Sequence, residues 1–216
     1  MQLSTLEEAS IEPSVHPSVN SSTKRFIDIV GASIGLVITG VAFIPIAIAI
    51  RFDSPGSALY SQVRCGLKGN YFRIWKFRSM LSEAEALKQQ VKNEASGHIF
   101  KSKNDPRITR IGKVLRKTSL DELPQFWNVI KGEMSLVGTR PPTPDEVKHY
   151  SSHHLKRLRV KPGMTGEWQV RGRSSVQDFD EIVQMDLHYQ RKWSVFYDLS
   201  LIARTVWVVL TRQGAY

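Results

Sequence analysis

An uncharged stretch of about 22 residues, 29–50, constrains the fold of this chain more than any other feature of its sequence. As a helix that rises about 1.5 Å per residue, it is long enough to cross the ~30 Å hydrocarbon core of a membrane. It is too long for the apolar part of a cleaved signal peptide, and the segment before it is acidic rather than basic. We therefore expect a membrane helix near the start of the chain.

Pro45 lies well inside this apolar stretch, where it removes one helical hydrogen bond and favours a kink. Basic residues flank both ends of the stretch, at Lys24, Arg25 and Arg51. Because cytoplasmic segments are enriched in Lys and Arg, a helix that enters the membrane, breaks at Pro45 and returns to the same face satisfies both flanks. A single-span signal anchor with a tolerated proline is the alternative, and residue physics alone does not choose between the two.

The charge of the chain is large and unevenly distributed. Lys and Arg number 30 against 20 Asp and Glu, which gives a formal net charge of +10, and every Lys and Arg lies at or after Lys24. Such a chain attracts polyanions, which include nucleic acid, an anionic membrane surface and phosphorylated substrates. The single cysteine, Cys65, excludes an internal disulfide and a zinc site built from cysteines.

We predict three segments: a flexible tail at 1–22, the membrane helix at 23–52 and a folded body at 53–216. The tail is rich in Ser, Glu and Pro and shows neither helical nor strand periodicity. The body has a mixed α/β pattern that is mainly helical. Its small β-hairpin is expected from strands at 57–64 and 71–78, on either side of a turn-rich segment.

Helices are predicted at 82–93, which begins with Ser and early Glu residues, and at 177–193 and 195–210. Helical spacing of apolar residues also occurs within 108–115 and 120–130. The last helix carries Trp207 and several aliphatic residues beside basic ones, so it is amphipathic and suited to a membrane interface. Packing on the body is the commoner outcome for such a helix.

Two adjacent carboxylates, Asp121 and Glu122, are the densest chemical signal in the chain. They follow a segment, 101–117, that holds seven basic residues and one acid, and they begin a predicted helix. A helix N-terminus and nearby cations such as Arg116 favour ionised carboxylates and attract phosphate. Paired carboxylates in this setting suit Mg²⁺, which often shares its oxygen ligands with substrate phosphates. A capping box formed by Ser119 and Glu122 explains the same pattern without any chemistry.

Two loops rich in Gly and Pro carry further candidate residues. The loop at 132–142 holds Arg140, whose guanidinium suits bidentate binding of a phosphate or, equally, a structural salt bridge. The loop at 162–173 contains Trp168, which is able to stack on a ring, and two Arg residues follow it.

Nucleic-acid binding is suggested by the strand segment 75–78, in which aromatic and basic residues alternate. Alternation of this kind is also what a half-buried strand produces. The histidines, among them His149, His153 and His154, lack the spacing of a metal site with a third ligand and are assigned to the surface.

From Lys24 to Tyr216 the chain resembles the bacterial sugar transferases of the monotopic phosphoglycosyl transferase superfamily. The resemblance covers about nine-tenths of the chain and follows the family's order of motifs. Its landmarks are Lys24-Arg25-x-x-Asp28, Lys76-Phe77-Arg78-Ser79-Met80, the segments 115–123, 132–142 and 162–173, and Asp186 with Tyr189.

The resemblance implies an enzyme that initiates exopolysaccharide synthesis. Such an enzyme transfers a hexose 1-phosphate, with galactose or glucose as first expectations, from a UDP-sugar to undecaprenyl phosphate, releases UMP and requires Mg²⁺. It implies a monotopic protein of the bacterial inner (cytoplasmic) membrane, with a re-entrant helix, amphipathic interfacial helices and a catalytic domain at 53–216 that faces the cytoplasm. The implied partners are the two substrates and inner-membrane lipid, with no nucleic acid, and a homodimer is compatible with the resemblance.

The resemblance also assigns roles to individual residues. Asp121 becomes the nucleophile that forms an aspartyl-phosphosugar intermediate, and Glu122 its partner in metal binding or in the second step. The remaining assignments are phosphate binding by Lys76, Arg116 and Arg140, nucleotide or sugar binding by Trp168, Gln169, Arg171 and Arg173, metal binding by Asp121 and Glu122, and the membrane helix break at Pro45.

Two positions depart from the family pattern. The family commonly has Ser-Pro at the helix break, whereas this chain has Ile44-Pro45, which lacks a hydroxyl to bond the carbonyl that the proline frees. The family loop usually reads Gly-Pro-Arg-Pro, whereas Thr139 precedes Arg140 here, so we expect a looser loop.

A basic, membrane-anchored module that recruits nucleic acid or anionic lipid is the competing hypothesis. It accounts for the net charge and the apolar anchor. It does not account for the Asp121-Glu122 pair between two loops that are suited to bind phosphate. Formation of a labelled lipid and of UMP from a UDP-sugar separates the two hypotheses.

Overall fold

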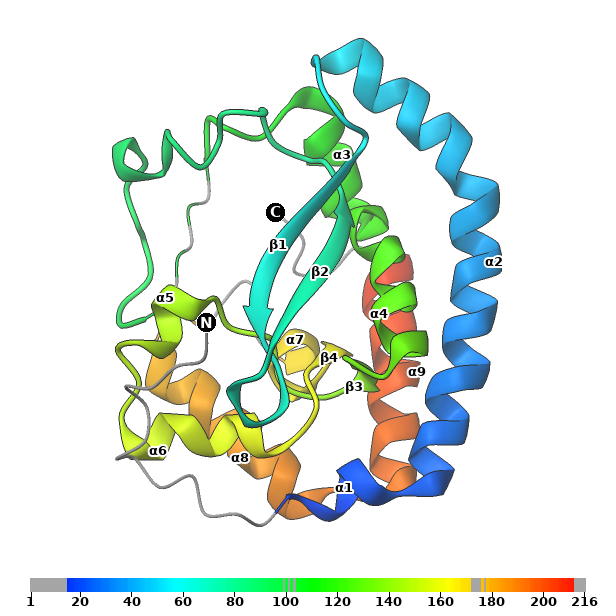
Figure 1. Ribbon diagram of the computed structural model, residues 1–216, viewed down its shortest axis with the longest axis vertical. Helices are drawn as coiled ribbons and strands as arrows, with labels where there is room; N and C mark the ends of the chain where they lie inside the picture. The colour runs from blue at the N-terminus through cyan, green and yellow to red at the C-terminus, as the bar shows by residue number, and fades with distance from the viewer. Residues whose placement is uncertain are drawn as a thin grey trace.

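A computed structural model describes residues 15–98, 100, 102, 104–171, 176 and 178–211. Its described part is mainly helical with a small antiparallel hairpin, as predicted (Figure 1). The helices are α1 (Pro17–Asn20), α2 (Ser22–Asp53), α3 (Arg110–Thr118), α4 (Phe126–Lys131), α5 (Pro144–Val147), α6 (Ser152–Leu155), α7 (Glu167–Arg171), α8 (Phe179–Lys192) and α9 (Val195–Thr211). Short 3₁₀ helices are η1 (Leu67–Gly69), η2 (Lys88–Gln90), η3 (Leu120–Gln125) and η4 (Lys156–Arg159); the strands are β1 (Leu59–Cys65), β2 (Tyr71–Phe77), β3 (Ser135–Val137) and β4 (Gly163–Thr165).

Helix α2 contains the whole apolar stretch in one helix of 32 residues and continues through Pro45. The predicted break into two helices is therefore wrong at the level of secondary structure. Figure 1 shows that α2 instead leans toward the hairpin in its upper part, as a single lost hydrogen bond in an otherwise intact helix allows. Among the described helices, α2 is the one that is long and apolar enough to cross a membrane.

Helix α2 lies along the body because small residues on one of its faces allow close approach. A Cβ atom added to Gly35 would lie 2.4 Å from the ring of Phe126 on α4. One turn further on, the Thr39 hydroxyl donates to the carbonyl of Leu123 in η3 at 3.2 Å. The middle of the apolar helix thus packs directly on the 3₁₀ helix that carries Asp121.

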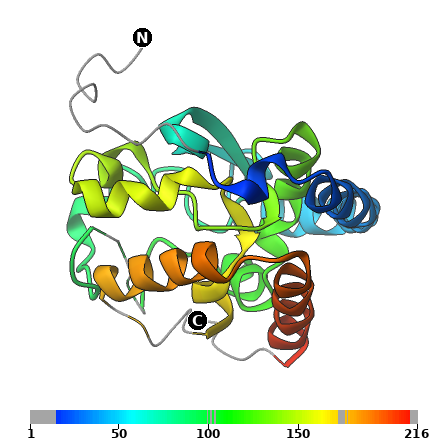
Figure 2. The same ribbon diagram turned by 90° about the horizontal axis from the view of Figure 1, so that it is seen from below.

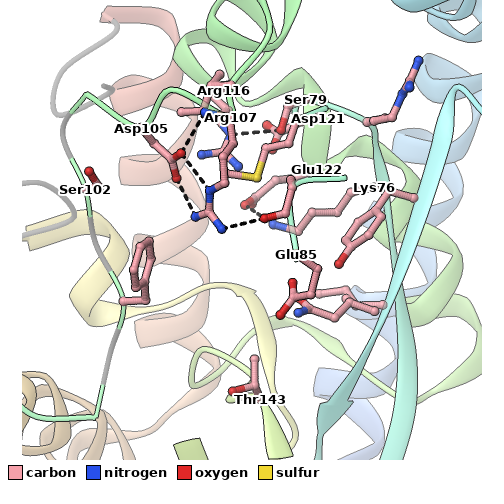
Figure 3. A pocket seen from close by; sticks show the side chains of 18 of the residues that line it. Lys76, Ser79, Glu85, Ser102, Asp105, Arg107, Arg116, Asp121, Glu122 and Thr143 are labelled. Atoms are coloured by element: carbon pink, nitrogen blue, oxygen red, sulfur yellow. Dashed lines mark hydrogen bonds and ion pairs between the residues drawn. The ribbon is translucent and has the colours of Figure 1, made fainter. Parts of the chain in front are cut away.

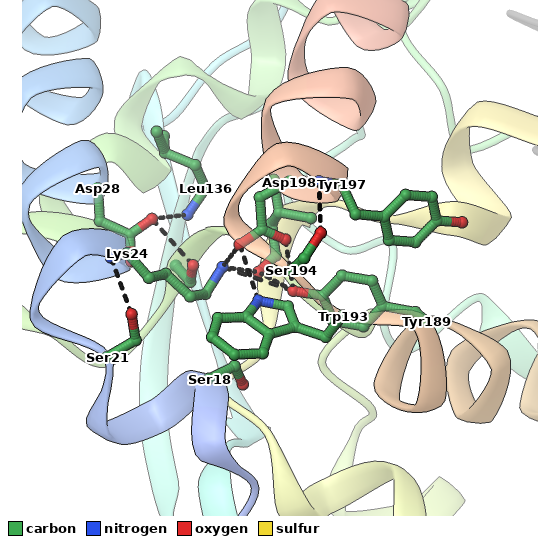
Figure 4. A network of polar contacts seen from close by, with 12 residues as sticks. Ser18, Ser21, Lys24, Asp28, Leu136, Tyr189, Trp193, Ser194, Tyr197 and Asp198 are labelled. Atoms are coloured by element: carbon green, nitrogen blue, oxygen red, sulfur yellow. Dashed lines mark hydrogen bonds and ion pairs between the residues drawn. The ribbon is translucent and has the colours of Figure 1, made fainter.

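A buried polar network fixes the first turns of α2 to α9 and β3 (Figure 4). Lys24 Nζ donates to Asp198 Oδ2 at 2.6 Å and to the carbonyl of Val137 at 2.9 Å. Asp198 also accepts from the Tyr189 hydroxyl at 2.8 Å and from the Trp193 indole at 3.1 Å. Every charge in this network has several partners, so it anchors the helix rather than offering a binding site.

Two further residues from the motifs that carry the family resemblance, Asp28 on α2 and Asp186 on α8, also have structural partners. Asp28 accepts from the hydroxyl of Ser135 at 2.9 Å and from the amide of Leu136 at 2.8 Å. Asp186 forms a fully buried ion pair with Arg157. Asp28 therefore joins α2 to β3, and Asp186 joins α8 to η4.

The two predicted strands form the antiparallel hairpin, with Tyr60 opposite Lys76 and Gln62 opposite Ile74. A second pairing, parallel and between β3 and β4, was not predicted from the sequence. The hairpin lies at the centre of the view in Figure 1, whereas α8 and α9 lie further from the viewer, as the view from below shows (Figure 2). The helices expected at 177–193 and 195–210 correspond to α8 and α9 and are confirmed.

The helix predicted at 82–93 is wrong, since this segment consists of turns and the short helix η2. The residues expected to begin this helix form hydrogen bonds with other segments of the chain. The Ser82 hydroxyl donates to the carbonyl of Pro55 at 2.9 Å, and the carbonyl of Ala84 accepts from Arg107 at 3.0 Å. Tertiary partners therefore replace the helical hydrogen bonds.

The end of the predicted flexible tail is structured. Residues 17–20 form α1, the amide of His16 donates to the carbonyl of Arg159 at 3.2 Å, and its Nε2 lies 2.9 Å from the carbonyl of Gln190. The tail boundary at residue 22 is therefore too late, and residues 1–14 lie outside the described residues.

Candidate active site

A cavity of about 1060 Å³ opens between the hairpin, the segment that follows β2, the α3–η3 corner and α5 (Figure 3). Among the residues lining it, eight are Lys or Arg and seven are Asp or Glu. The charged lining residues are Arg64, Lys76, Arg78, Arg107, Lys113, Arg116, Lys117 and Arg140, with Glu85, Glu94, Asp105, Asp121, Glu122, Asp145 and Glu146. The charges of these described residues nearly balance, so anion binding depends on local groups within the cavity.

The corner between α3 and η3 brings Asp121 and Glu122 to the cavity. Helix α3 ends at Ser119, which has a left-handed φ of 57° and turns the chain into η3. Asp121 is only 5% exposed, and Glu122 Oε1 accepts from Lys76 Nζ at 3.1 Å. Ser119 makes no side-chain capping bond to this turn, so the capping-box alternative is wrong.

Lys76 and Arg116 accompany the two carboxylates in the cavity (Figure 3). Lys76 extends from β2, whereas Arg116 extends from α3 and donates through Nε to the Ser79 hydroxyl at 2.9 Å. Burial lowers the pKa of Arg116, although Asp121 opposes this shift. An arginine remains charged despite such a shift, so two cations and two carboxylates meet at this end of the cavity.

Arg140 reaches the cavity from the loop after β3 and lies 3.2 Å from Glu146. Burial alone would raise the pKa of Glu146, but Arg140 and Arg64 outweigh burial and the pKa lies below its ordinary value. The loop itself is held firmly, contrary to the expectation from Thr139. The Thr139 hydroxyl donates to the carbonyl of Arg157 at 3.2 Å, and its carbonyl accepts from the amide of Gly163 at 2.9 Å.

The residues predicted to bind nucleotide or sugar are dispersed. Trp168 reaches the cavity wall but is only 6% exposed and packs in a core cluster with residues that include Phe179. Gln169 is not among the cavity-lining residues, and neither is Arg171, which lies 3.3 Å from Glu167. Arg173 lies outside the described residues.

Three cavity residues on β1 were missed by the sequence analysis: Tyr60, Gln62 and Arg64. They alternate along the strand and therefore point to one face, and cross-strand pairing puts Lys76 on that same face. Strand periodicity in the predicted hairpin indicates that these three residues share one face. The register that brings Tyr60 opposite Lys76 does not follow from the pattern alone.

The cavity is compatible with a divalent cation, but the described side chains do not by themselves form a closed metal site. Among the described residues, no group of three or more His, Cys, Asp or Glu side chains has the arrangement of a metal site. Mg²⁺ commonly uses only one or two carboxylates and completes its shell with water and substrate phosphates. Asp121 and Glu122 fit that donor set.

Comparison with known proteins identifies relatives over most of the chain. Residues 19–212 match the family model described as bacterial sugar transferase. The chain is 53% identical over 194 residues to a protein of Streptococcus agalactiae named galactosyl transferase CpsE, and 44% identical over 199 residues to the undecaprenyl-phosphate galactose phosphotransferase of Salmonella typhimurium. These matches cover 89% of this chain but only 43% and 41% of the two relatives. The exopolysaccharide production protein ExoY of Rhizobium meliloti is 38% identical over 204 residues, which cover 92% of this chain and 90% of that protein.

Proposed function

This chain belongs to the bacterial sugar transferase family, and on that premise we propose that it transfers a sugar 1-phosphate from a UDP-sugar to undecaprenyl phosphate. The products are undecaprenyl-diphosphate-sugar and UMP, in the first membrane step of exopolysaccharide or capsule synthesis. Relatives named for galactose transfer and others named for glucose 1-phosphate transfer make these two sugars the first candidates. The observation that carries the proposal is the Asp121-Glu122 pair in a cavity beside Lys76 and Arg116.

We propose two displacements at one phosphorus atom. A carboxylate oxygen of Asp121 attacks the sugar-side phosphorus of the donor, the bond from that phosphorus to the oxygen of UMP breaks, and UMP leaves with the electron pair. An oxygen of undecaprenyl phosphate then attacks the same phosphorus and releases the Asp121 carboxylate. A covalent intermediate divides one difficult transfer between two anions into two easier steps.

Repulsion between the donor diphosphate and the two carboxylates has to be offset for the first step to occur. Lys76 and Arg116 only balance the charges of Asp121 and Glu122. Additional positive charge would favour this step, and Mg²⁺ held by these carboxylates and by the diphosphate would supply it by neutralising the developing negative charge. Lys76, which donates to Glu122, positions that carboxylate at the cavity end where Asp121 lies.

We also propose that the protein is attached to one face of the cytoplasmic membrane and that the catalytic domain faces the cytoplasm. Both ends of α2 contact the same body, since Lys24 bonds Asp198 and Asp53 accepts from the amide of Ile111 at 2.9 Å. The outward face of α2 is apolar, and Trp207 on α9 is 64% exposed. These faces support a helix that enters the lipid and returns to the same side, with α9 lying at the interface.

The transfer reaction is tested with the purified chain in detergent, a radiolabelled UDP-sugar, Mg²⁺ and undecaprenyl phosphate. The panel of donors includes UDP-galactose, UDP-glucose and UDP-N-acetylhexosamines, and both UMP and labelled lipid are measured. We expect both products from at least one donor. Absence of both with every donor would leave the alternative of a basic membrane-binding module.

The orientation is tested by cysteine labelling at the two ends of α2. Asn20→Cys and Ser57→Cys are introduced at exposed positions, while the native Cys65 is buried. A membrane-impermeant maleimide should label both in inside-out vesicles and neither in right-side-out vesicles. Labelling of the two positions from opposite sides would contradict the monotopic arrangement.

A further inference from the structure

We propose that Arg64, together with Arg140, binds the nucleoside-side phosphate of the donor, which is the phosphate that leaves with UMP. This inference rests on the proposed transfer of a sugar 1-phosphate from a UDP-sugar. It adds a positioning role for a residue on β1 and divides the cavity into two phosphate sites.

The first argument is the order of groups along the cavity. Asp121 and Arg116 lie at one end, and Lys76 with Glu122 comes next. Tyr60, Gln62 and Arg64 then follow the strand away from Lys76, because Tyr60 is the residue that pairs with Lys76. From residue 60 to residue 64 the strand backbone extends about 13 Å, at roughly 3.3 Å per residue, but the long Arg64 side chain comes close enough to the reacting end for Glu122 to act on its pKa. One face of the hairpin therefore leads from the reacting carboxylate to a second cationic cluster.

The second argument is local charge. Around Asp121 and Glu122 the two carboxylates balance Lys76 and Arg116, whereas Arg64 and Arg140 share Glu146, which acts on Arg64 more strongly than Glu122 does. This second cluster carries a formal charge of +1. An anionic group that departs from the reacting phosphorus is stabilised best by a cation placed in advance at the position to which it withdraws.

The third argument is the supply of hydrogen-bond donors. Arg64 donates through Nη1 to the carbonyl of Pro141 at 3.0 Å, and through Nε and Nη2 to Gln62 Oε1 at 3.1 and 2.7 Å. Within the part of the chain that the structure describes, these bonds use three of its five N–H groups. Gln62 and Pro141 therefore fix the plane of the guanidinium while two N–H groups remain for a phosphate oxygen.

Arg64 also fixes the loop that carries Arg140. Its bond to the carbonyl of Pro141 is followed by one from the amide of Cys65 to the carbonyl of Pro142 at 2.9 Å. The two guanidinium groups are close enough for Arg140 to contribute to a lowered Arg64 pKa of about 10, after the larger effect of burial. Two arginines kept together against their mutual repulsion are what a bound phosphate would stabilise.

The experiment compares the binding of UMP and uridine to the full chain in detergent by isothermal titration. Because uridine lacks the phosphate, the ratio of the two affinities reports the phosphate contact. Arg64→Gln should weaken UMP about 10-fold or more, the loss expected for a charge-assisted hydrogen bond, and leave uridine affinity unchanged. Arg64→Lys should recover part of the loss, since it keeps the charge without the planar fork.

Arg73→Gln is the matched control, because it removes one positive charge from the outer face of the same hairpin. The Arg73 guanidinium donates to the exposed Ser61 hydroxyl at 3.4 Å and is not among the described residues that line the cavity, so this variant should leave the UMP-to-uridine ratio unchanged. Gln62→Ala keeps Arg64 but removes the group that orients it, so it should weaken UMP by a smaller factor than Arg64→Gln. An unchanged UMP-to-uridine ratio in Arg64→Gln would overturn the inference even if uridine binding fell as well.

Failure of this inference is distinguishable from failure of the proposed function. If the wild-type chain forms labelled lipid and UMP but Arg64→Gln retains full UMP affinity, only the assignment of Arg64 is wrong. If the wild-type chain binds neither UMP nor a UDP-sugar and forms no product, the proposed reaction itself is wrong.

Discussion

Two charged regions of this molecule are built from the same residue types and differ in what surrounds them. In the network at the base of α2, Lys24 and Asp198 are 7% and 4% exposed in their side chains and are enclosed by protein. In the cavity, Lys76 and Glu122 form a similar ion pair but are 28% and 26% exposed. The first pair faces protein on every side, whereas the second faces an open volume of about 1060 Å³.

The difference indicates what each region contributes. Charges removed from water are tolerated only when hydrogen bonds compensate them, and a fully satisfied network specifies one arrangement of its elements. Charges that keep contact with a cavity retain the capacity to bind another ion. We therefore expect substitutions at the base of α2 to affect folding, and substitutions in the cavity to affect activity.

Asp121→Asn should have the largest effect and should leave the fold intact. The side chain keeps its volume, but an amide does not serve as the nucleophile, so turnover should fall on the order of 10³-fold or more. The measurement is the rate of UMP release, together with mass spectrometry of the protein after incubation with donor alone. A phosphosugar adduct that is still present in Asp121→Asn would remove this residue from the proposed role.

Lys24→Met should break the other region. It leaves Asp198 buried without its cation, and loss of one partner of a buried pair costs about 3–5 kcal/mol. Chemical unfolding in detergent measures the loss. The double variant Lys24→Met, Asp198→Asn removes both charges, while the Asn oxygen still accepts from Trp193 and its amide donates to the Tyr189 hydroxyl, so it should recover part of the stability. A loss below about 1 kcal/mol in the single variant would show that the network does not anchor α2.

The contrast also explains how far the sequence predicts this fold. The strands at 57–64 and 71–78 and the helices at 177–193 and 195–210 were predictable, because period and turn residues agree along each segment. The segment 82–93 was not predictable, because Arg107, which is distant in sequence, donates a hydrogen bond to the carbonyl of Ala84. The parallel pairing of β3 with β4 was missed because three-residue strands carry almost no periodic signal.

The candidate site was predictable where its signal is local. The pair Asp121-Glu122 with Arg116 stands out within a few residues, and the structure brings Lys76 and Arg140 into the same cavity. Roles that need three-dimensional placement were not predictable. Arg64 joins the cavity only through strand register, whereas Gln169 lies outside it because the loop after β4 forms the short helix α7.

Gly35→Ala tests whether close packing of α2 couples the two regions. The added methyl group meets the Phe126 ring at 2.4 Å, and overpacking of this kind costs about 1–3 kcal/mol. Because Phe126 directly follows η3, activity should fall as well. Gly40→Ala is the matched control, since no atom lies within 4 Å of the added group, and Ala favours a helix over Gly by about 1 kcal/mol. Equal stability of the two variants would mean that α2 does not pack closely on α4.

Glu146→Gln should have the smallest effect, a loss of stability at neutral pH that disappears as the pH falls. Burial alone would raise the pKa of Glu146, but Arg140 and Arg64 lower it by a larger amount. The pKa of Glu146 in the folded chain is therefore below that in the unfolded chain. A carboxylate with a lowered pKa adds stability above its unfolded pKa of about 4.3. That stability is lost as pH falls through the lower pKa of the folded state.

The Gln side chain retains an oxygen that accepts from the amide of Thr143, so Glu146→Gln removes the charge but not the helix cap. Thermal unfolding measured between pH 7 and pH 3 should therefore show a shallower acid decline in this variant than in the wild type. Parallel curves would indicate that Glu146 does not titrate differently in the two states.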